Sequence, residues 1–184
     1  MIVIVMGVSG AGKTTVGRML ADALGAEFLE GDAFHPPKNV EKMRAGIALA
    51  DADRLPWLQA IAAALDSRIG QARDVVIAYS ALRRAYRRIL AGARRDTHFV
   101  YLKGPETLVA HRLSARHGHY MPPSLLPSQF AALEEPRPDE RALVLDISQS
   151  PDGLVAQALA ALYPDGGDPP ATKGPSSRVT EPGQ

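Results

Sequence analysis

Short apolar runs alternate along the chain with segments of helical periodicity. The runs are rich in Val, Ile and Leu and have few polar positions, a pattern typical of parallel strands that are buried on both faces. We expect five strands, at residues 2–6, 28–29, 75–79, 98–102 and 142–147. Strands that alternate with helices predict a three-layer α/β fold, in which a five-stranded parallel sheet carries helices on both faces.

The segments between these runs repeat apolar residues at intervals of three and four, as amphipathic helices do. The expected helices lie at residues 13–24, 36–44, 82–90, 105–117, 124–133 and 153–162, with a further helix that Asp51 or Asp53 can cap. In that further helix, the side chains expected to face the core are Trp57, Leu58, Ile61 and Leu65. We expect Ser124 to cap the helix at 124–133.

The expected elements end near residue 163, where the composition of the chain changes. Residues 164–184 are mainly Pro, Gly, Ser, Asp and Thr, which bury too little apolar surface to fold, so we expect a disordered tail. Residues 1–163 then form one domain that is large enough for a hydrophobic core. A break containing Gly and Pro at residues 118–123 indicates a mobile lid at about residues 117–128.

The overall composition is that of a soluble globular protein, with 46% hydrophobic and 22% charged residues. A net charge of +1 provides no general attraction to nucleic acid or to a membrane surface. The chain has no cysteine, which excludes disulfides and thiol chemistry. It opens on a strand without a secretion signal and holds no apolar run of bilayer length, so we expect a cytoplasmic location.

Residues Gly7–Thr14 match the phosphate-binding pattern G-x-x-x-x-G-K-[ST] at every position. An expected strand precedes the motif and an expected helix follows it, so backbone N–H groups and the helix N-terminus can face a phosphate chain. In this arrangement Lys13 reaches the β- and γ-phosphates, and the hydroxyl of Thr14 can ligate Mg²⁺. A glycine-rich turn without a ligand is the alternative, but the complete pattern arises by chance in roughly one chain in a few hundred.

Two carboxylates follow the second expected strand. Ligands of parallel α/β sheets bind beyond the carboxyl ends of the strands, which is where Glu30 and Asp32 lie in the sequence. A carboxylate at this edge can accept a proton from a substrate hydroxyl or hold Mg²⁺ through water. We expect such a role for Asp32, whereas for Glu30 a turn that caps the next helix is an equally good interpretation.

Two arginines with helical spacing follow the third expected strand. Arg83 and Arg87 are four residues apart and therefore share one helix face near the same edge of the sheet. The planar guanidinium group matches the geometry of a carboxylate or a phosphate. We expect Arg84 and Arg88, which face elsewhere, to be solvated.

A second pair with this spacing, Arg112 and Arg116, precedes the expected lid, where both side chains can close over phosphates. Arg54 lies beside acidic residues, so an ion pair with Asp51 or Asp53 is the alternative to substrate binding. Three histidines lack the spacing of a zinc site, which leaves them lid or substrate roles: His35, His117 and His119.

Further motifs, together with the phosphate-binding loop, resemble the gluconate kinases, a family of P-loop small-molecule kinases. The similarity covers nearly all of residues 1–163. The segments that carry it are Gly31–Pro36, Asp51–Leu58, Ser80–Arg83, Arg112–Tyr120 and Leu125–Phe130. The Asp-Arg-x-Pro-Trp-Leu and Gly-His-aromatic pieces within these segments are more specific to the family than the phosphate-binding loop is.

The resemblance implies ATP-dependent phosphorylation of D-gluconate to 6-phosphogluconate with Mg²⁺, a sheet ordered as in adenylate and shikimate kinases, and commonly a homodimer. The implied nucleotide contacts are Gly7, Val8, Ser9, Gly10, Ala11, Gly12, Lys13, Thr14, Thr15 and Arg112, with Arg112 against adenine and Thr14 on the metal. The implied catalytic residues are Lys13, Asp32 and Arg116. The implied substrate contacts are Asp32, His35, Arg54, Ser80, Arg83 and His119.

Two residues depart from the family pattern. Glu30 stands where Asp is common, and Tyr79 stands where a smaller residue, often Cys, is usual. The alternative functions are a kinase for another small hydroxy acid, such as shikimate, and a non-catalytic nucleotide-binding module. A GTPase would carry the guanine-binding sequence N-K-x-D, which this chain lacks, and a nucleic-acid role lacks a net basic domain.

Overall fold

The computed structural model describes residues 1–94, 96–114 and 123–164. The first part of the expected lid, residues 117–122, therefore lies outside the described residues, as does nearly all of the expected tail from residue 164. In the described part of the chain, no helix combines the length and the apolar character that crossing a bilayer requires.

Five parallel strands form one sheet, as the apolar runs predicted. They are β1 (Ile2–Met6), β2 (Glu27–Glu30), β3 (Val75–Ala78), β4 (Thr97–Lys103) and β5 (Ala142–Asp146). Their order across the sheet is β2-β3-β1-β4-β5, so β1 is central and its Ile4 pairs with Ile77 of β3 and Phe99 of β4. All four neighbouring pairs are parallel, and the loops that follow the strands therefore meet at one edge of the sheet.

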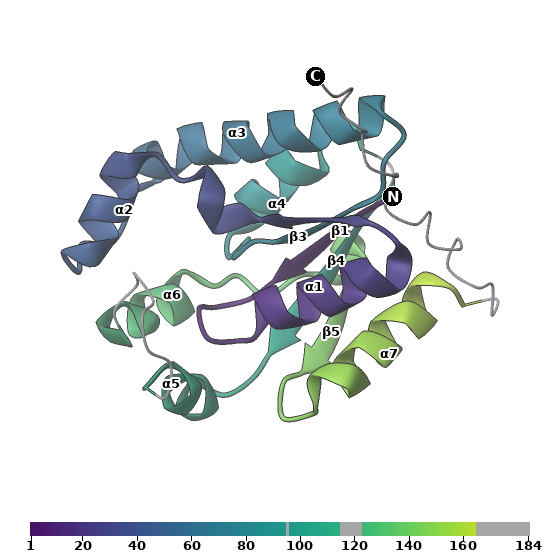
Figure 1. Ribbon diagram of the computed structural model, residues 1–184. Helices are drawn as coiled ribbons and strands as arrows, with labels where there is room; N and C mark the ends of the chain where they lie inside the picture. Colours follow the sequence, from purple (N-terminus) through teal and green to yellow (C-terminus); the bar gives the residue numbers. More distant parts are fainter. Residues whose placement is uncertain (95, 115–122, 165–184) are drawn as a thin grey trace, which may run out of the picture.

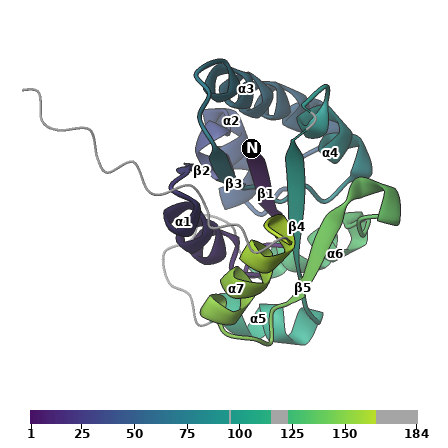
Figure 2. The same cartoon turned by 90° about the vertical axis from the view of Figure 1, so that its right-hand side faces the viewer.

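Helices cover both faces of this sheet (Figures 1 and 2). Their bounds are α1 (Lys13–Leu24), α2 (Pro37–Arg44), α3 (Asp51–Gly70), α4 (Arg84–Ala91), α5 (Glu106–Ser114), α6 (Leu126–Ala132) and α7 (Pro151–Leu162). Three short 3₁₀ turns are η1 (Gly31–Phe34), η2 (Pro123–Leu125) and η3 (Pro138–Glu140). The helices α3 and α4 lie on one face, and α1 and α7 lie on the other, as the view along the sheet shows (Figure 2).

The core is divided in two by the sheet, because successive side chains of a strand point to opposite faces. From β1, Val3 and Val5 pack with residues of α1 and α7, whereas Ile4 and Met6 pack against α3 and α4. A third, smaller cluster joins Met43, Leu49 and Leu125 beyond the carboxyl ends of the strands. There α2 and α6 lie on opposite sides of the edge where ligands are expected (Figure 1).

Two expected helix caps are wrong. The N-cap of α3 is Ala50, and Asp53 acts from inside the first turn, where its Oδ2 accepts the Ala50 N–H at 3.0 Å. Ser124 falls within η2, and α6 begins only after Leu125, its N-cap. A favourable capping residue therefore located each helix to within a few positions without fixing its first residue.

Candidate active site

The loop between β1 and α1 forms one wall of a cavity that we call the loop cavity. Its lining residues are Ser9, Gly10, Gly12, Lys13, Thr14, Thr15, Glu30, Asp32 and Arg112. Gly10 and Gly12 have φ angles of +86° and +97°, which glycine adopts without the strain that a side chain brings. At Gly10 a Cβ atom would also lie 2.7 Å from Leu113. The glycines of the motif are thus required by the path of the backbone around the cavity.

Contacts within the protein hold this loop in place. The N–H group of Ala11 donates to the carbonyl of Val8 at 3.2 Å, and the N–H of Ser9 donates to Oε1 of Gln129, from α6, at 2.7 Å. The side chains of Val8 and Ala11 are buried in the core on the α1 face. Of the expected nucleotide contacts, Gly7, Val8 and Ala11 therefore shape the loop and do not line the cavity.

Oxygen and nitrogen groups suited to phosphates and a divalent cation meet in the loop cavity. Lys13 lines it, and the Nζ of this lysine donates to the carbonyl of Val8 at 2.9 Å. The Thr14 side chain hydrogen-bonds the Glu30 carboxyl group, whose pKa is raised mainly by burial, although this hydrogen bond lowers it. Two oxygen donors beside a lysine form a group that fits a phosphate chain with Mg²⁺, a cation that prefers oxygen ligands.

Two residues from other elements complete the loop cavity. Asp32 lies in η1, directly after β2, at the sheet edge where the sequence placed it. Arg112 comes from the last turn of α5, and its Nη2 donates to the carbonyl of Ile147, just after β5, at 2.7 Å. Lysine, arginine and aspartate side chains from three different elements thus surround one space.

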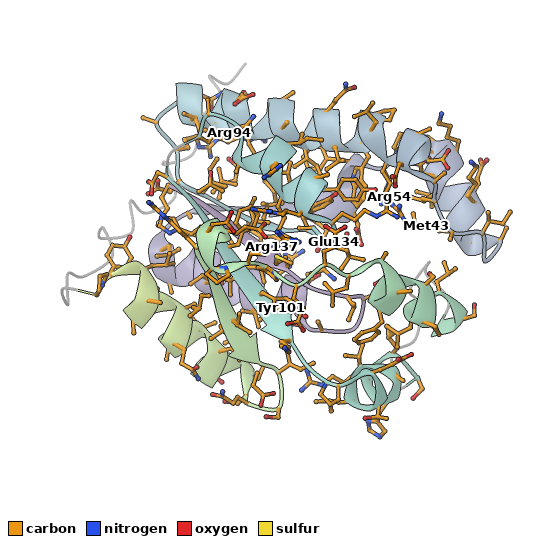
Figure 3. All side chains as sticks on the ribbon, turned by 180° about the vertical axis from the view of Figure 1, so that it is seen from behind. Met43, Arg54, Arg94, Tyr101, Glu134 and Arg137 are labelled. Carbon is orange, nitrogen blue, oxygen red and sulfur yellow. The ribbon has the colours of Figure 1, made fainter. Side chains whose placement is uncertain are left out.

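A second space, which we call the inner cavity, continues from the first. Its lining residues are Ser9, Lys13, Asp32, His35, Met43, Ala48, Leu49, Arg54, Trp57, Ser80, Leu82, Leu125, Ser128, Gln129 and Ala132. Ser9, Lys13 and Asp32 line both cavities, so the two spaces meet at these residues. Figure 3 shows Arg54 and Met43 together at the end of the molecule formed by α2 and the start of α3.

An aromatic stack forms part of the wall of the inner cavity. The ring of His35 lies parallel to Trp57, with centroids 3.6 Å apart, and Tyr79 meets Trp57 edge-on at 4.7 Å. Nε1 of Trp57 donates to the carbonyl of Gly31 at 2.7 Å, which fixes the indole beside η1. Burial is the main influence that lowers the pKa of His35 to about 4, so this imidazole is neutral at pH 7.

Arg54 and Arg83 converge on the same carboxylate at one end of the inner cavity. Nη1 of Arg54 lies 3.2 Å from Oδ1 of Asp51, and Nη1 of Arg83 lies 2.6 Å from Oδ2. The hydroxyl of Tyr86 also donates to Asp51, at 2.5 Å. This hydrogen bond leads the influences that lower the pKa of Asp51. Two guanidinium groups around one carboxylate leave a net positive charge for an anionic ligand.

The sequence left open whether Arg54 forms an ion pair with Asp51 or Asp53, and the structure confirms the pair with Asp51. Arg54 also lines the inner cavity. Asp53 is engaged elsewhere, because Nζ of Lys42 lies 2.8 Å from its Oδ1. Ser80 lines the inner cavity as expected. Arg83 lines a smaller side chamber that shares Arg54, Trp57 and Ser80, among other residues, with the inner cavity.

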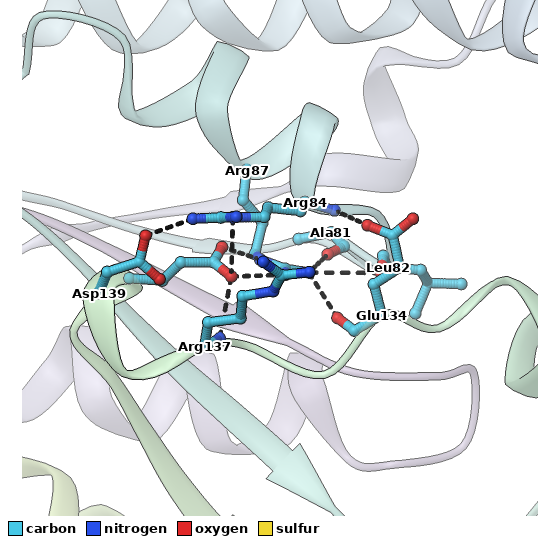
Figure 4. Close-up of polar contacts among 8 residues, drawn as sticks. Ala81, Leu82, Arg84, Arg87, Glu134, Arg137 and Asp139 are labelled. Carbon is cyan, nitrogen blue, oxygen red and sulfur yellow. Dashed lines mark hydrogen bonds and ion pairs between the residues drawn. The ribbon is translucent and has the colours of Figure 1, made fainter.

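Although helical spacing places Arg83 and Arg87 on one helix face, Arg87 lines neither the loop cavity, the inner cavity nor the side chamber. Arg87 is only 1% exposed and lies behind the loop that follows β3 (Figure 4). Its Nη1 donates to the carbonyls of Ala81 and Glu134, both at 2.9 Å, and its Nη2 donates to Oε1 of Glu140 at 2.9 Å. Arg87 therefore ties the loop after β3 to the segment before β5, and its fork has no surface left for a substrate.

Arg84 also differs from expectation, since it is not a solvated side chain. Its guanidinium group pairs with Asp139, and its backbone N–H donates to Oε2 of Glu134 at 2.7 Å (Figure 4). Arg88 is exposed, as expected. Three further expected site residues, Arg116, His117 and His119, lie outside the described residues.

The comparisons with known proteins agree with this arrangement. A family model described as an AAA domain matches residues 2–135. A gluconokinase of Gluconobacter oxydans is 46% identical over 85% of this chain and 88% of its own. A gluconokinase structure from Sinorhizobium meliloti, also 46% identical, has a TM-score of 0.79 and covers 88% of this chain and 91% of its own. The chain belongs to the gluconokinase family.

A further relative of known structure is an unliganded sugar kinase from Janibacter sp., with a TM-score of 0.84, 46% identity, and coverage of 88% of this chain and 93% of that one. Membership of the gluconokinase family confirms the resemblance found in the sequence and the P-loop kinase fold. As a P-loop kinase, the protein is an enzyme that binds ATP and acts on a small molecule.

Two cavity residues of this gluconokinase family member were missed by sequence reasoning. Trp57 was assigned to the core, which its 4% exposure supports, but one face of its ring also carries His35. The position of Trp57 directly after Arg54 and Pro56, in a segment specific to the family, was the available indication. Gln129 lay in another such segment, yet its contact with Ser9 spans 120 residues of sequence and leaves no local pattern.

Proposed function

We propose that the protein transfers the γ-phosphoryl group of ATP to the primary hydroxyl of D-gluconate, giving ADP and 6-phospho-D-gluconate. The observation that carries this proposal is the junction of the two cavities at Lys13 and Asp32. A nucleotide phosphate chain in the loop cavity ends at this junction, and so does a polyhydroxy acid held in the inner cavity. Phosphoryl transfer needs little more than this alignment and charge stabilisation.

At the nucleotide end, we assign the phosphates to the loop backbone and to Lys13. Thr14 and Glu30 would hold Mg²⁺, which supplies positive charge at the β- and γ-phosphates when bound. The side chains of Thr14 and Thr15 line the same cavity. Arg112 lies at its rim and is assigned to the adenine ring by analogy with related kinases.

At the acceptor end, Asp32 is proposed to orient the reacting hydroxyl and to accept its proton. The excess positive charge of Arg54 and Arg83 around Asp51 suits the carboxylate of the sugar acid, at the far end of the inner cavity. His35 and Ser80 offer neutral polar groups between these ends. The roles assigned to Arg116 and His119, on the transferring phosphate and the acid, stay predictions.

The activity is tested with purified protein, Mg-ATP and a panel of sugar acids and shikimate, with each product identified by mass. The proposal predicts 6-phosphogluconate as the preferred product. Lys13→Ala serves as the inactive control, because it removes the charge at the β- and γ-phosphates while leaving the helix intact. Strong preference for another acid would contradict the proposal, and ATP hydrolysis that needs no acceptor would favour a nucleotide-binding module.

Three broader expectations stay predictions. We propose one catalytic domain at residues 1–163, so truncation after Tyr163 is expected to leave activity and melting temperature nearly unchanged. A large loss of either activity or melting temperature would show that the domain extends beyond residue 163.

The homodimer implied by the family is tested by light scattering. The cytoplasmic location expected from the sequence is tested by fractionation of cells.

A further inference from the structure

The hydroxyl group of Tyr79 is the least explained polar group near the inner cavity. Tyr79 follows β3 directly and is 1% exposed. Its hydroxyl is buried and has no hydrogen-bond partner among the described residues. Buried phenol hydroxyls nearly always find a partner, because leaving one unsatisfied is unfavourable by about 1–3 kcal/mol.

Packing alone explains the ring of Tyr79 but leaves its hydroxyl unexplained. The ring meets Trp57 edge-on, and a Cβ atom at Gly31 would come within 3.2 Å of the Tyr79 Cβ, so the two segments are in close contact. A phenylalanine would make these same contacts without placing a polar atom in the interior. The hydroxyl therefore indicates a partner that enters the protein from outside.

The surroundings of Tyr79 connect it with the proposed binding site for the acid. Tyr79 lines the side chamber together with Arg54, Ser80 and Arg83. Burial is the main influence that raises the pKa of Tyr79, so the hydroxyl keeps its proton at neutral pH. Because Arg54 lines both this side chamber and the inner cavity, Tyr79 lies beside the end of the site that is proposed to bind the carboxylate.

The chemistry of the neighbouring groups limits what Tyr79 can recognise. Arginine side chains offer only donors, which suits a carboxylate. A phenol hydroxyl both donates and accepts, so its matched partner is another hydroxyl group. In an aldonic acid, the hydroxyl nearest the carboxylate is on the adjacent carbon.

We propose that Tyr79 is a specificity-determining residue, whose hydroxyl hydrogen-bonds the α-hydroxyl of the bound acid while Arg54 and Arg83 bind its carboxylate. The substrate class selected in this way is the α-hydroxy acids. The inference rests on the proposed function, since it concerns the same acceptor site. A site that hydrogen-bonds a substrate hydroxyl discriminates against the analogue that lacks it, because the buried group is then left unpaired.

The experiment compares D-gluconate with 2-deoxy-D-gluconate, which lacks only the α-hydroxyl. In the wild type, kcat/KM for the deoxy acid is expected to be lower by about tenfold or more. Tyr79→Phe keeps the ring and is expected to lower kcat/KM for gluconate about three- to tenfold, mainly through KM. The deoxy acid should respond little to this substitution, so the selectivity of the variant falls toward one.

Tyr101→Phe is the matched control, because Tyr101 is a buried phenol of β4 that lines neither cavity nor the side chamber. It is expected to retain wild-type selectivity between the two acids. Thermal unfolding checks that both variants are folded.

Two results would overturn the inference. One is a Tyr79→Phe variant that keeps the wild-type selectivity. The other needs no variant at all: a wild-type enzyme with equal kcat/KM for the two acids. A wild type that phosphorylates neither acid but prefers an unrelated acceptor contradicts the proposed function itself, so the two failures are distinguishable.

Discussion

Arg83 and Arg87 are four residues apart at the start of α4, yet they lie in two different environments. Arg83 has a side chain that is 38% exposed and shares the carboxylate of Asp51 with Arg54 at the side chamber. Arg87 is 1% exposed and is fully occupied by Glu140 and backbone carbonyls. Helical spacing placed the two residues on one helix face, but only Arg83 lies where we propose that the acid binds, whereas the contacts of Arg87 are structural.

The difference follows from what each guanidinium group meets. The loop after β3 contains Ala81, which has φ of +46°, an unfavourable conformation for a residue with a side chain. The guanidinium group of Arg87 is not available to a substrate, because it donates to the carbonyl groups of Ala81 and Leu82 in this loop. Through these hydrogen bonds, Arg87 stabilises the loop that positions Ser80 and Arg83 at the side chamber.

The largest expected effect is on stability, from Arg87→Ala. Removal of one partner of a buried ion pair leaves Glu140 and several carbonyls without donors, which costs about 3–5 kcal/mol in the free energy of unfolding. Denaturant unfolding measures this loss. Arg88→Ala, on the exposed side of the same helix, is the control and is expected to change stability by less than about 0.5 kcal/mol. Equal losses in the free energy of unfolding for Arg87→Ala and Arg88→Ala would contradict the structural role assigned to Arg87.

A smaller effect is expected from Arg83→Lys, and it concerns binding. Lysine keeps the positive charge but loses the planar fork, so the KM for gluconate is expected to rise about tenfold, equivalent to about 1.4 kcal/mol. The free energy of unfolding should change little, because the Arg83–Asp51 pair is exposed. Steady-state kinetics and denaturant unfolding on the same preparation test this; lost stability with an unchanged KM would make Arg83 a structural residue like Arg87.

A pH dependence of stability should further distinguish the buried Arg87–Glu140 pair from the exposed Arg83–Asp51 pair. Burial alone would raise the pKa of Glu140, but hydrogen bonds from Arg87 and from the Arg137 N–H lower it below its usual value. Below about pH 4.5 the unfolded chain therefore binds the additional proton, and the stability that Glu140 contributes is lost as the pH falls.

Thermal unfolding of the wild type and of Glu140→Gln should accordingly differ at pH 7 and converge as the pH drops below about 4.5. Asp51→Asn is the control from the cavity side. Its carboxyl group also has a lowered pKa, but it is exposed, so the difference from the wild type should be small at every pH. If the difference in melting temperature between the wild type and Glu140→Gln grew as the pH fell, the assigned direction of the Glu140 pKa shift would be wrong.

Much of the fold was predictable because its determinants are local. The strand at Ile2–Met6 and the helix at Lys13–Leu24 have the expected bounds, since an apolar run, a glycine loop and a periodic helix are each encoded within a few residues. Asp32 and Lys13 were placed correctly for a related reason. In a parallel sheet, the end of a strand defines where the following residue lies.

The rest of the site could not be predicted because it depends on contacts distant in sequence. Arg87 meets Glu140 across 53 residues, and nothing near either residue distinguishes a buried pair from a solvated one. The same holds for the proposed acid-binding end, where Asp51 and Tyr86 meet across 35 residues. The packing of α3 against α4 brings Asp51 and Tyr86 together.

The central claim is that the inner cavity has a reacting end at Asp32 and a carboxylate-binding end at Arg54. The most direct test is steady-state kinetics of Asp32→Asn and Arg54→Lys, with circular dichroism to confirm folding. We predict that Asp32→Asn lowers kcat by about 100-fold or more with little change in KM for gluconate. Arg54→Lys should raise that KM by about tenfold and change kcat much less, and the KM for ATP should move little in either variant. An effect of Asp32→Asn on KM alone, or an unchanged gluconate KM in Arg54→Lys, would contradict the claim.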